Sequence, residues 1–203
     1  MATSSSGNCI RHVFLSGTPG IGKTTLIRKV VAQLQQSSLT VQGFYTEEVR
    51  DGGKRIGFDV VTLNGDKGPL ARVSTGTSSE AETGRGPTVG QYTVDLNSFE
   101  SLALPELSTK DQDSSLPSVL IIDEVGKMEL FSQTFIQLVR RLLGQSSPPI
   151  LGTLPVPKGR PLGLVEEIRR RKDVKIFMVS RGNRDDLLRE IVRTVLQVRA
   201  NTT

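Results

Sequence analysis

The stretch that decides the fold of this chain reads Gly17-Thr18-Pro19-Gly20-Ile21-Gly22-Lys23-Thr24. It follows the pattern G-x-x-x-x-G-K-T, which is typical of a loop that cradles phosphate groups, the P-loop. Its glycines allow backbone turns that a Cβ atom would block, so successive N–H groups can point at phosphate oxygens. Lys23 supplies a positive charge for the β- and γ-phosphates, and the Thr24 hydroxyl is a ligand for Mg²⁺. The stretch therefore predicts a site for a nucleoside triphosphate.

The sequence on either side of this loop predicts a strand followed by a helix. Residues 13–15 are a short apolar run, as in a buried parallel strand, and apolar residues recur at helical spacing over 25–34. The N-terminus of that helix would attract anions. A glycine-rich turn without a ligand is the alternative, and the agreement of strand, loop and helix disfavours it. We expect nucleotide contacts from Gly17, Thr18, Pro19, Gly20, Ile21, Gly22, Lys23, Thr24 and Thr25.

The composition is that of an aliphatic chain without the marks of a membrane or secreted protein. The 203 residues are 36% hydrophobic and 4% aromatic, and no apolar run reaches the roughly 18 residues of a membrane helix. Residues 1–8 lack the apolar segment of a signal peptide. The single cysteine, Cys9, excludes an internal disulfide framework and fits a reducing compartment. We therefore expect a cytoplasmic or otherwise intracellular protein, with a flexible tail at 1–10 and one domain at 11–203.

The charge balance of the chain is basic. The net charge is +5, which suits polyanionic ligands such as nucleotides and also permits nucleic acid. The densest basic run covers residues 169–172, and we interpret it as a solvated helix end whose cations complement the helix dipole. Aromatic residues are scarce and no RNA-reading motif is found, so nucleic acid is not an expected partner.

The rest of the chain alternates predicted strands and helices. Strands are expected at 41–49, 56–63, 91–96, 119–122, 150–154 and 174–179. Helices are expected at 98–104, 131–143, 162–171 and 185–198, and polar loops at 75–88 and 108–117. Asp51-Gly52-Gly53 is a turn signal between the first two of these strands, which should form an antiparallel hairpin. The order predicts an α/β fold: a mostly parallel sheet with helices on both faces and an added antiparallel hairpin.

Two carboxylates follow the apolar run at 119–122. Ligands bind at the carboxyl ends of parallel strands, so Asp123 should face Thr24 and share Mg²⁺ with it. Glu124, one residue further on, is placed to orient or deprotonate the water that attacks the γ-phosphate. The alternatives are a helix cap for Asp123 and a helix-dipole charge for Glu124. Thr153, at the end of another strand, is either a sensor of the γ-phosphate or a turn residue.

Phosphoryl transfer also needs positive charge beyond Lys23. Lys127 is the first candidate because it follows the acidic pair closely; the others are Arg55, Lys158, Arg160 and Arg184. Asn183 and Arg184 resemble a guanine-reading motif with Arg in the place of Lys, and a helix cap by Asn183 is the simpler interpretation. His12 is expected to be structural.

Six stretches carry a more specific signal: GTPGIGKTTL (17–26), GFYTEEVR (43–50), RIGFDVVTL (55–63), VLIIDEVGKMEL (119–130), LGTLPVPKG (151–159) and VEEIRRRKDV (165–174). Together they resemble the THEP family of nucleoside-triphosphatases. The resemblance implies a RecA-like P-loop fold and slow, Mg²⁺-dependent hydrolysis of several nucleoside triphosphates to diphosphate and phosphate. It also implies nucleotide contacts from the P-loop and from Val119, Leu120, Ile121, Ile122, Asp123, Glu124, Val125 and Gly126.

The sequence therefore predicts a monomeric hydrolase of ATP, GTP, CTP and UTP, with Mg²⁺ as cofactor, Thr24 and Asp123 as metal ligands, and Lys23, Glu124 and Lys127 as catalytic residues. A nucleoside or nucleotide kinase is the first alternative, with the acidic pair positioning an acceptor hydroxyl. An RNA- or partner-binding module switched by nucleotide is the second.

Overall fold

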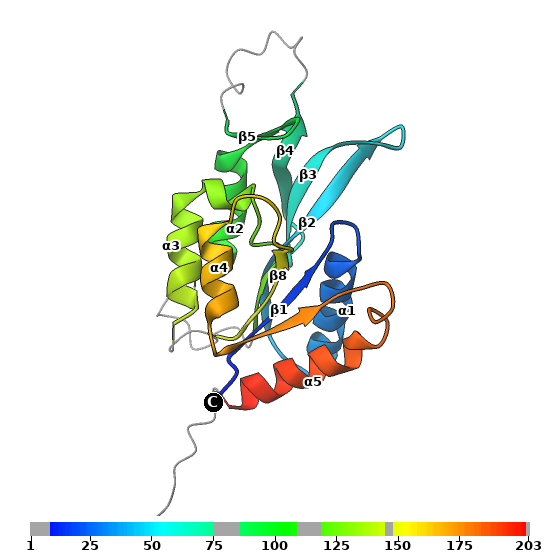
Figure 1. Cartoon of the computed structure of the whole chain (residues 1–203), viewed down its shortest axis with the longest axis vertical. Coiled ribbons are helices and arrows are strands. Elements are labelled where there is room, and N and C mark those ends of the chain that lie inside the picture. The colour runs from blue at the N-terminus through cyan, green and yellow to red at the C-terminus, as the bar shows by residue number, and fades with distance from the viewer. Residues whose placement is uncertain (1–8, 75–85, 109–118, 145–147, 202–203) are drawn as a thin grey trace, which may run out of the picture.

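The computed structural model describes residues 9–74, 86–108, 119–144 and 148–201. The described strands form one sheet in the order β5-β6-β4-β3-β2-β7-β8-β1-β9 (Figure 1). Its parallel part consists of β1 (His12–Gly17), β2 (Val41–Asp51), β7 (Val119–Ile122), β8 (Ile150–Pro155) and β9 (Val174–Met178). Neighbours within this group pair in parallel, and β1 and β7 are buried throughout. The predicted parallel core is confirmed.

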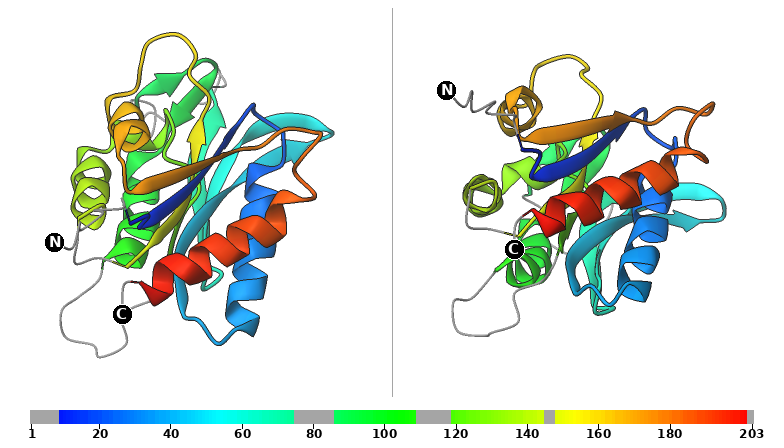
Figure 2. Two further views of the ribbon diagram at one scale, coloured as in Figure 1. Left: turned by 60° about the horizontal axis from the view of Figure 1, so that its bottom comes forward. Right: turned by 90° about the horizontal axis from the view of Figure 1, so that it is seen from below.

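Helices cover both faces of the parallel strands. α1 (Lys23–Gln36) and α5 (Leu187–Ala200) lie side by side on one face (Figure 2). The opposite face packs against α2 (Leu96–Leu107), α3 (Gln133–Leu142) and α4 (Gly163–Arg170). Each face has its own apolar core, because alternate residues of a strand point to opposite sides. On the second face the rings of Phe44, Phe99 and Phe135 meet edge to face, with centroids 5.2 to 6.1 Å apart. These rings fix α2 and α3 against the strand next to β7.

The antiparallel part is larger than the single hairpin that was expected. β2 and β3 (Lys54–Thr62) form that hairpin, and Gly52 and Gly53 have φ angles of 52° and 80° at its turn. β4 (Lys67–Val73), β6 (Tyr92–Val94) and β5 (Thr88–Val89) then continue the sheet in antiparallel order. β4 escaped prediction because its sequence, KGPLARV, is poor in β-branched residues and holds Gly and Pro. Its pairing with β3 outweighs that weak local preference.

The strand predicted at 91–96 and the helix predicted at 98–104 were wrong in their boundaries. The strand stops at Val94, because Asp95 caps α2 by accepting a hydrogen bond from Ser98 N at 2.9 Å. The helix then runs through Pro105. Of the polar loop predicted at 75–88, residues 75–85 lie outside the described residues and Thr88 opens β5; of the loop at 108–117, only Ser108 is described.

The basic run at 169–172 is only in part the solvated helix end that was expected: Arg170 and Lys172 are exposed, whereas Arg169 and Arg171 are partly buried. Arg169 donates to Ser16 Oγ at 2.7 Å and to the Pro155 carbonyl at 2.6 Å. Arg171 pairs with Asp173 and donates to the Leu143 carbonyl at 2.7 Å. The Arg169 guanidinium thus binds a carbonyl oxygen at the end of β8, and the Arg171 guanidinium binds one at the C-terminus of α3, where the last carbonyl groups of a helix have no partner within it.

The start of the described chain gives two further outcomes. His12 is fully buried in β1 and accepts the Ile150 N–H through Nδ1 at 3.2 Å, so its expected structural role is confirmed. Of the tail predicted at 1–10, residues 1–8 lie outside the described residues, and Cys9 is exposed. Among the described helices, none combines the length and apolar character needed to cross a bilayer.

Candidate active site

The P-loop joins β1 to α1 in the conformation that its glycines allow. Gly20 and Gly22 have φ angles of 74° and 105°, in the left-handed region that other residues rarely adopt. A Cβ atom on Gly17 would lie 2.7 Å from the Val179 carbonyl oxygen, so this position requires glycine for close packing on the neighbouring strand end. Gly22 is the N-cap of α1, and the helix presents its first N–H groups towards the loop. This end of α1 therefore has the backbone geometry that favours an anion.

Lys23 connects the P-loop to the acidic pair. Its side chain is almost buried, with 10% exposed. Nζ donates to the Gly17 carbonyl at 3.1 Å and lies 3.5 Å from Oε2 of Glu124. The lysine and the glutamate are 101 positions apart in sequence and meet because β1 and β7 flank β8 in the sheet. The ammonium group is thus held between the loop and a carboxylate.

Asp123 lies directly behind this contact, at the end of β7. It is 1% exposed, and its N–H donates to the Phe44 carbonyl at 3.2 Å. Thr153 Oγ1 donates to its Oδ1, while Oδ2 is buried and has no hydrogen-bond partner among the described residues. Burial raises the pKa of Asp123; the Thr153 and Thr24 hydroxyls and the Lys23 charge oppose this rise. Thr24 approaches the carboxyl group without completing a hydrogen bond to Oδ2, which leaves that oxygen available to a ligand.

Glu124 is the more accessible of the two acids, with 28% of its side chain exposed. The peptide bond between Asp123 and Glu124 is cis. Burial raises the pKa of Glu124, Lys23 lowers it, and the Asp123 charge raises it further. A raised pKa makes the carboxylate a stronger base, as proton abstraction from water requires. The next residue, Val125, donates its N–H to the Thr153 carbonyl at 3.0 Å, which fixes the acidic pair to β8.

The structure brings one of the five additional cation candidates into contact with the P-loop. Arg184 Nη1 donates to the Ile21 carbonyl at 3.5 Å. Arg55 is at the outer part of the hairpin, paired with Glu48 at 2.5 Å. Lys127 is exposed in the turn after Gly126 and forms no ion pair with a described residue. Lys158 and Arg160 are exposed in the connection from β8 to α4.

Asn183 is occupied within its own loop. Its Oδ1 accepts the Ser180 N–H at 2.8 Å, and its Nδ2 donates to the Met178 carbonyl at 2.9 Å. The side chain therefore closes the turn between β9 and α5. α5 itself begins only at Leu187, so Asn183 stabilises the turn before the helix.

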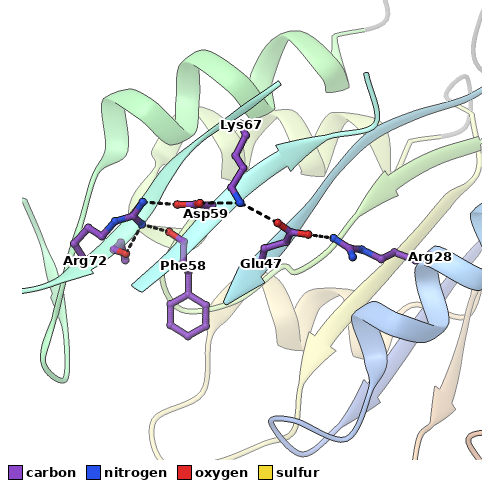
Figure 3. A network of polar contacts seen from close by, with 7 residues as sticks. Arg28, Glu47, Phe58, Asp59, Lys67 and Arg72 are labelled. Carbon is purple, nitrogen blue, oxygen red and sulfur yellow. Dashed lines mark hydrogen bonds and ion pairs between the residues drawn. The ribbon is translucent and has the colours of Figure 1, made fainter. Parts of the chain in front are cut away.

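A chain of alternating charges beside the site was missed by sequence reasoning. Arg28 of α1 stacks over the Tyr45 ring, 4.0 Å from its centroid, and pairs with Glu47 of β2 (Figure 3). Lys67 bridges Glu47 and Asp59 at 3.0 and 3.2 Å, and Arg72 pairs with Asp59 at 2.5 Å. Arg28 is near enough to Asp123 to lower its pKa. No local pattern in the sequence marks this chain of charges, because its members come from α1, β2, β3 and β4 and meet only in the register of the folded sheet.

Glu129 was also missed. It begins the short 3₁₀ helix η1 (Glu129–Phe131), is 4% exposed and accepts the Gly126 N–H at 3.1 Å. Its sequence context, just before a helix, reads as an ordinary dipole charge.

Comparison with known proteins agrees with this geometry. A family model described as NTPase matches residues 12–192. The human cancer-related nucleoside-triphosphatase is 60% identical over 187 residues, covering 91% of this chain and 96% of the relative. The nucleoside-triphosphatase THEP1 of a Thermotoga species is 39% identical over 180 residues, or 89% and 92% of the two chains.

Solved structures show the same fold. The solution structure of the human protein has a TM-score of 0.77 and 59% identity, covering 91% of this chain and 97% of that one. The crystal structure of THEP1 from Aquifex aeolicus has a TM-score of 0.72 and 35% identity, covering 91% and 98%. With a family model matched over most of its length and relatives far above 30% identity, the chain belongs to the NTPase family of P-loop proteins.

Proposed function

We propose that this protein is a nucleoside-triphosphatase that hydrolyses nucleoside triphosphates to diphosphate and phosphate. One observation carries the proposal: the P-loop lysine lies 3.5 Å from a carboxylate that follows the metal-organising aspartate. That arrangement would put a phosphate-binding cation and a base for water beside the γ-phosphate of a bound nucleotide. The names of the human and bacterial relatives, all nucleoside-triphosphatases, support it.

We propose Mg²⁺ as the cofactor, held by Thr24 and Asp123. The fit rests on the buried, unpartnered Oδ2 of Asp123 and on the hydroxyl of Thr24 beside it. Among the described residues no three His, Cys, Asp or Glu side chains converge on one point, which matches a metal bound largely by phosphate oxygens. When bound, Mg²⁺ would neutralise charge on the β- and γ-phosphates.

The residues of the chain then have separate tasks in the displacement. The N–H groups at residues 20–24 and the Lys23 ammonium bind the triphosphate and favour the charge that builds up on the leaving diphosphate. Glu124 accepts a proton from a water molecule that lies in line with the γ-phosphate. At the same time the oxygen of that water molecule bonds to phosphorus. The bond from phosphorus to the β,γ-bridging oxygen breaks, and diphosphate departs with that oxygen. Thr153 holds Asp123 in place throughout.

Low base selectivity and slow turnover are part of the proposal. The Asn183 amide is held inside its own loop by one hydrogen bond at each of its polar atoms, which supports a structural role over the reading of a guanine edge. We therefore expect ATP, GTP, CTP and UTP all to be substrates. The exposed position of Lys127, which forms no ion pair with another described residue, supports slow turnover, because phosphoryl transfer is faster where a further cation is held at the phosphates. We further propose a monomeric, intracellular enzyme that needs no nucleic acid.

The test is phosphate release from the four nucleoside triphosphates, with and without Mg²⁺. We expect release from each without any acceptor, and none after chelation of the metal. A kinase would need an added acceptor hydroxyl. Activity that appears only with RNA would favour the switch alternative and oppose our assignment.

A further inference from the structure

A second buried carboxyl group lies beside Glu124 and has no part in the mechanism above. Glu129 is 4% exposed, and its Oε2 accepts the Gly126 N–H at 3.1 Å. Burying a carboxyl group is costly unless its surroundings compensate. The backbone N–H groups of Gly126 and of Glu129 itself favour the charged form but do not outweigh burial, so the position of Glu129 requires another explanation.

Gly126 is the point at which the two glutamates meet. A Cβ atom on Gly126 would lie 2.7 Å from Oε1 of Glu124 and 2.9 Å from Oε2 of Glu129. Both carboxyl oxygens therefore flank the same face of this glycine, and no third side chain fits between them. The other oxygen of Glu124 faces Lys23 at 3.5 Å. The Glu124 carboxylate is thus confined between the P-loop lysine on one side and Glu129 on the other.

Glu129 is a neutral acid in this setting. Burial raises its pKa to about 8, and the charges of Glu124 and Asp123 add to the rise. η1 also packs against α2 and α3, and the charged residues of these helices have other partners or are exposed. Glu100 accepts from Ser132, Glu106 from Asn64, Arg140 pairs with Glu167, and Arg141 is exposed. At neutral pH Glu129 therefore borders Glu124 without repelling its charge.

We propose that Glu129 is a positioning residue for hydrolysis: by holding Gly126 and bordering Glu124, it keeps the Glu124 carboxylate aimed at the phosphate-binding side of the site. This inference rests on the proposed nucleoside-triphosphatase function. Glu129 acts through Glu124 and touches neither the phosphates nor the attacking water. Loss of the Glu129 proton would place a second negative charge beside Glu124 and disturb the orientation of the Glu124 carboxylate.

The test compares two substitutions of Glu129 with a matched control. Glu129→Asp withdraws the carboxyl group from Gly126, so we expect kcat to fall about tenfold or more, with unchanged affinity for a non-hydrolysable ATP analogue. Glu129→Gln keeps the shape and stays neutral, so kcat at pH 7 should remain within about twofold of wild type. The wild-type kcat should decline near pH 8, and the Gln variant should lack that decline. The control, Glu100→Gln, changes a carboxyl group that contacts the neighbouring Ser132, and should leave kcat and its pH profile unchanged.

Three outcomes would overturn the inference. The first is a kcat of Glu129→Asp equal to that of the wild type. The second is a lowered kcat of Glu129→Asp that is accompanied by a lowered affinity for the ATP analogue. The third is a decline of kcat near pH 8 that is still present in Glu129→Gln. If Glu129→Asp fails to fold, Gly126→Ala is measured in its place, because the added Cβ would crowd the carboxyl groups of Glu124 and Glu129. An unchanged kcat in Gly126→Ala would also overturn the inference. Absence of phosphate release by the wild type would instead refute the proposed function itself.

Discussion

Thr153 Oγ1, inside β8, donates a hydrogen bond to Oδ1 of Asp123 and so ties β8 to the residue that follows β7. Asp123 is almost fully buried, and this hydroxyl opposes the rise in its pKa that burial causes. The contact helps to keep the carboxyl group ionised and turned towards Thr24, as a metal ligand must be.

Replacing Thr153 should therefore weaken the binding of Mg²⁺ at Asp123 and so lower the rate of hydrolysis. Thr153→Val leaves Oδ1 of Asp123 buried and unpaired, at a cost of about 1–3 kcal/mol. We expect a higher Mg²⁺ concentration for half-maximal phosphate release and a kcat lowered about tenfold. Thr153→Ser retains the hydroxyl and should stay near wild type. Equal activity of the Val and Ser variants would show that the contact has no such role.

His12 should make stability depend on pH. Burial lowers its pKa to about 4 from an ordinary value of 6.5, so the folded protein holds it neutral. The contribution of neutral His12 to the free energy of unfolding is complete above pH 6.5. It is lost as the pH falls from 6.5 to 4, and the loss amounts to up to about 3 kcal/mol. Urea unfolding across this range should show the loss.

The matched control is His12→Phe, which removes the titration and keeps an apolar ring in β1. Glu129 has a raised pKa and acts in the opposite direction, but it acts equally in both proteins. The difference between the two pH curves therefore isolates His12. If the free energies of unfolding of the wild type and of His12→Phe change with pH in parallel, His12 is not buried as a neutral ring.

The chain of charges across β2, β3 and β4 should contribute more to stability than an ordinary surface pair. Only 8% of the Asp59 side chain is exposed, and it holds both Arg72 and Lys67. We expect Asp59→Asn to lower the free energy of unfolding by about 1–3 kcal/mol. Glu167→Gln, which breaks a half-exposed pair with Arg140, should cost less than about 1 kcal/mol. If urea unfolding shows equal losses of unfolding free energy for Asp59→Asn and Glu167→Gln, the buried position of Asp59 adds nothing to the strength of its ion pairs.

The P-loop and the acidic pair could be predicted from the sequence because both signals are local. Gly20, Gly22 and Lys23 specify a turn and a charge within one loop, and four apolar residues before Asp123 specify a buried strand. Their meeting followed from the rule that parallel strands present their carboxyl ends at one edge. The whole parallel core was predictable for the same reason.

What could not be predicted depends on pairing across the sheet. β4 has little strand preference of its own and forms because β3 pairs with it. The contact of Arg169 with Ser16 joins residues 153 positions apart, and the basic run around it looked solvated. No motif in the sequence assigns a role to Glu129, and only the fold places it against Gly126. In each case tertiary contacts, and not the local sequence, decided.

We expect the P-loop and the acidic pair to face each other across one metal-bound triphosphate. A solved structure of Glu124→Gln with ATP and Mg²⁺ tests it most directly, because loss of the base should preserve the substrate. We predict the triphosphate along residues 17–24, with its γ-phosphate between Lys23 and the side chain at position 124, and the metal between Thr24 and Asp123. A polyphosphate bound elsewhere, or a metal away from Asp123, would contradict the account.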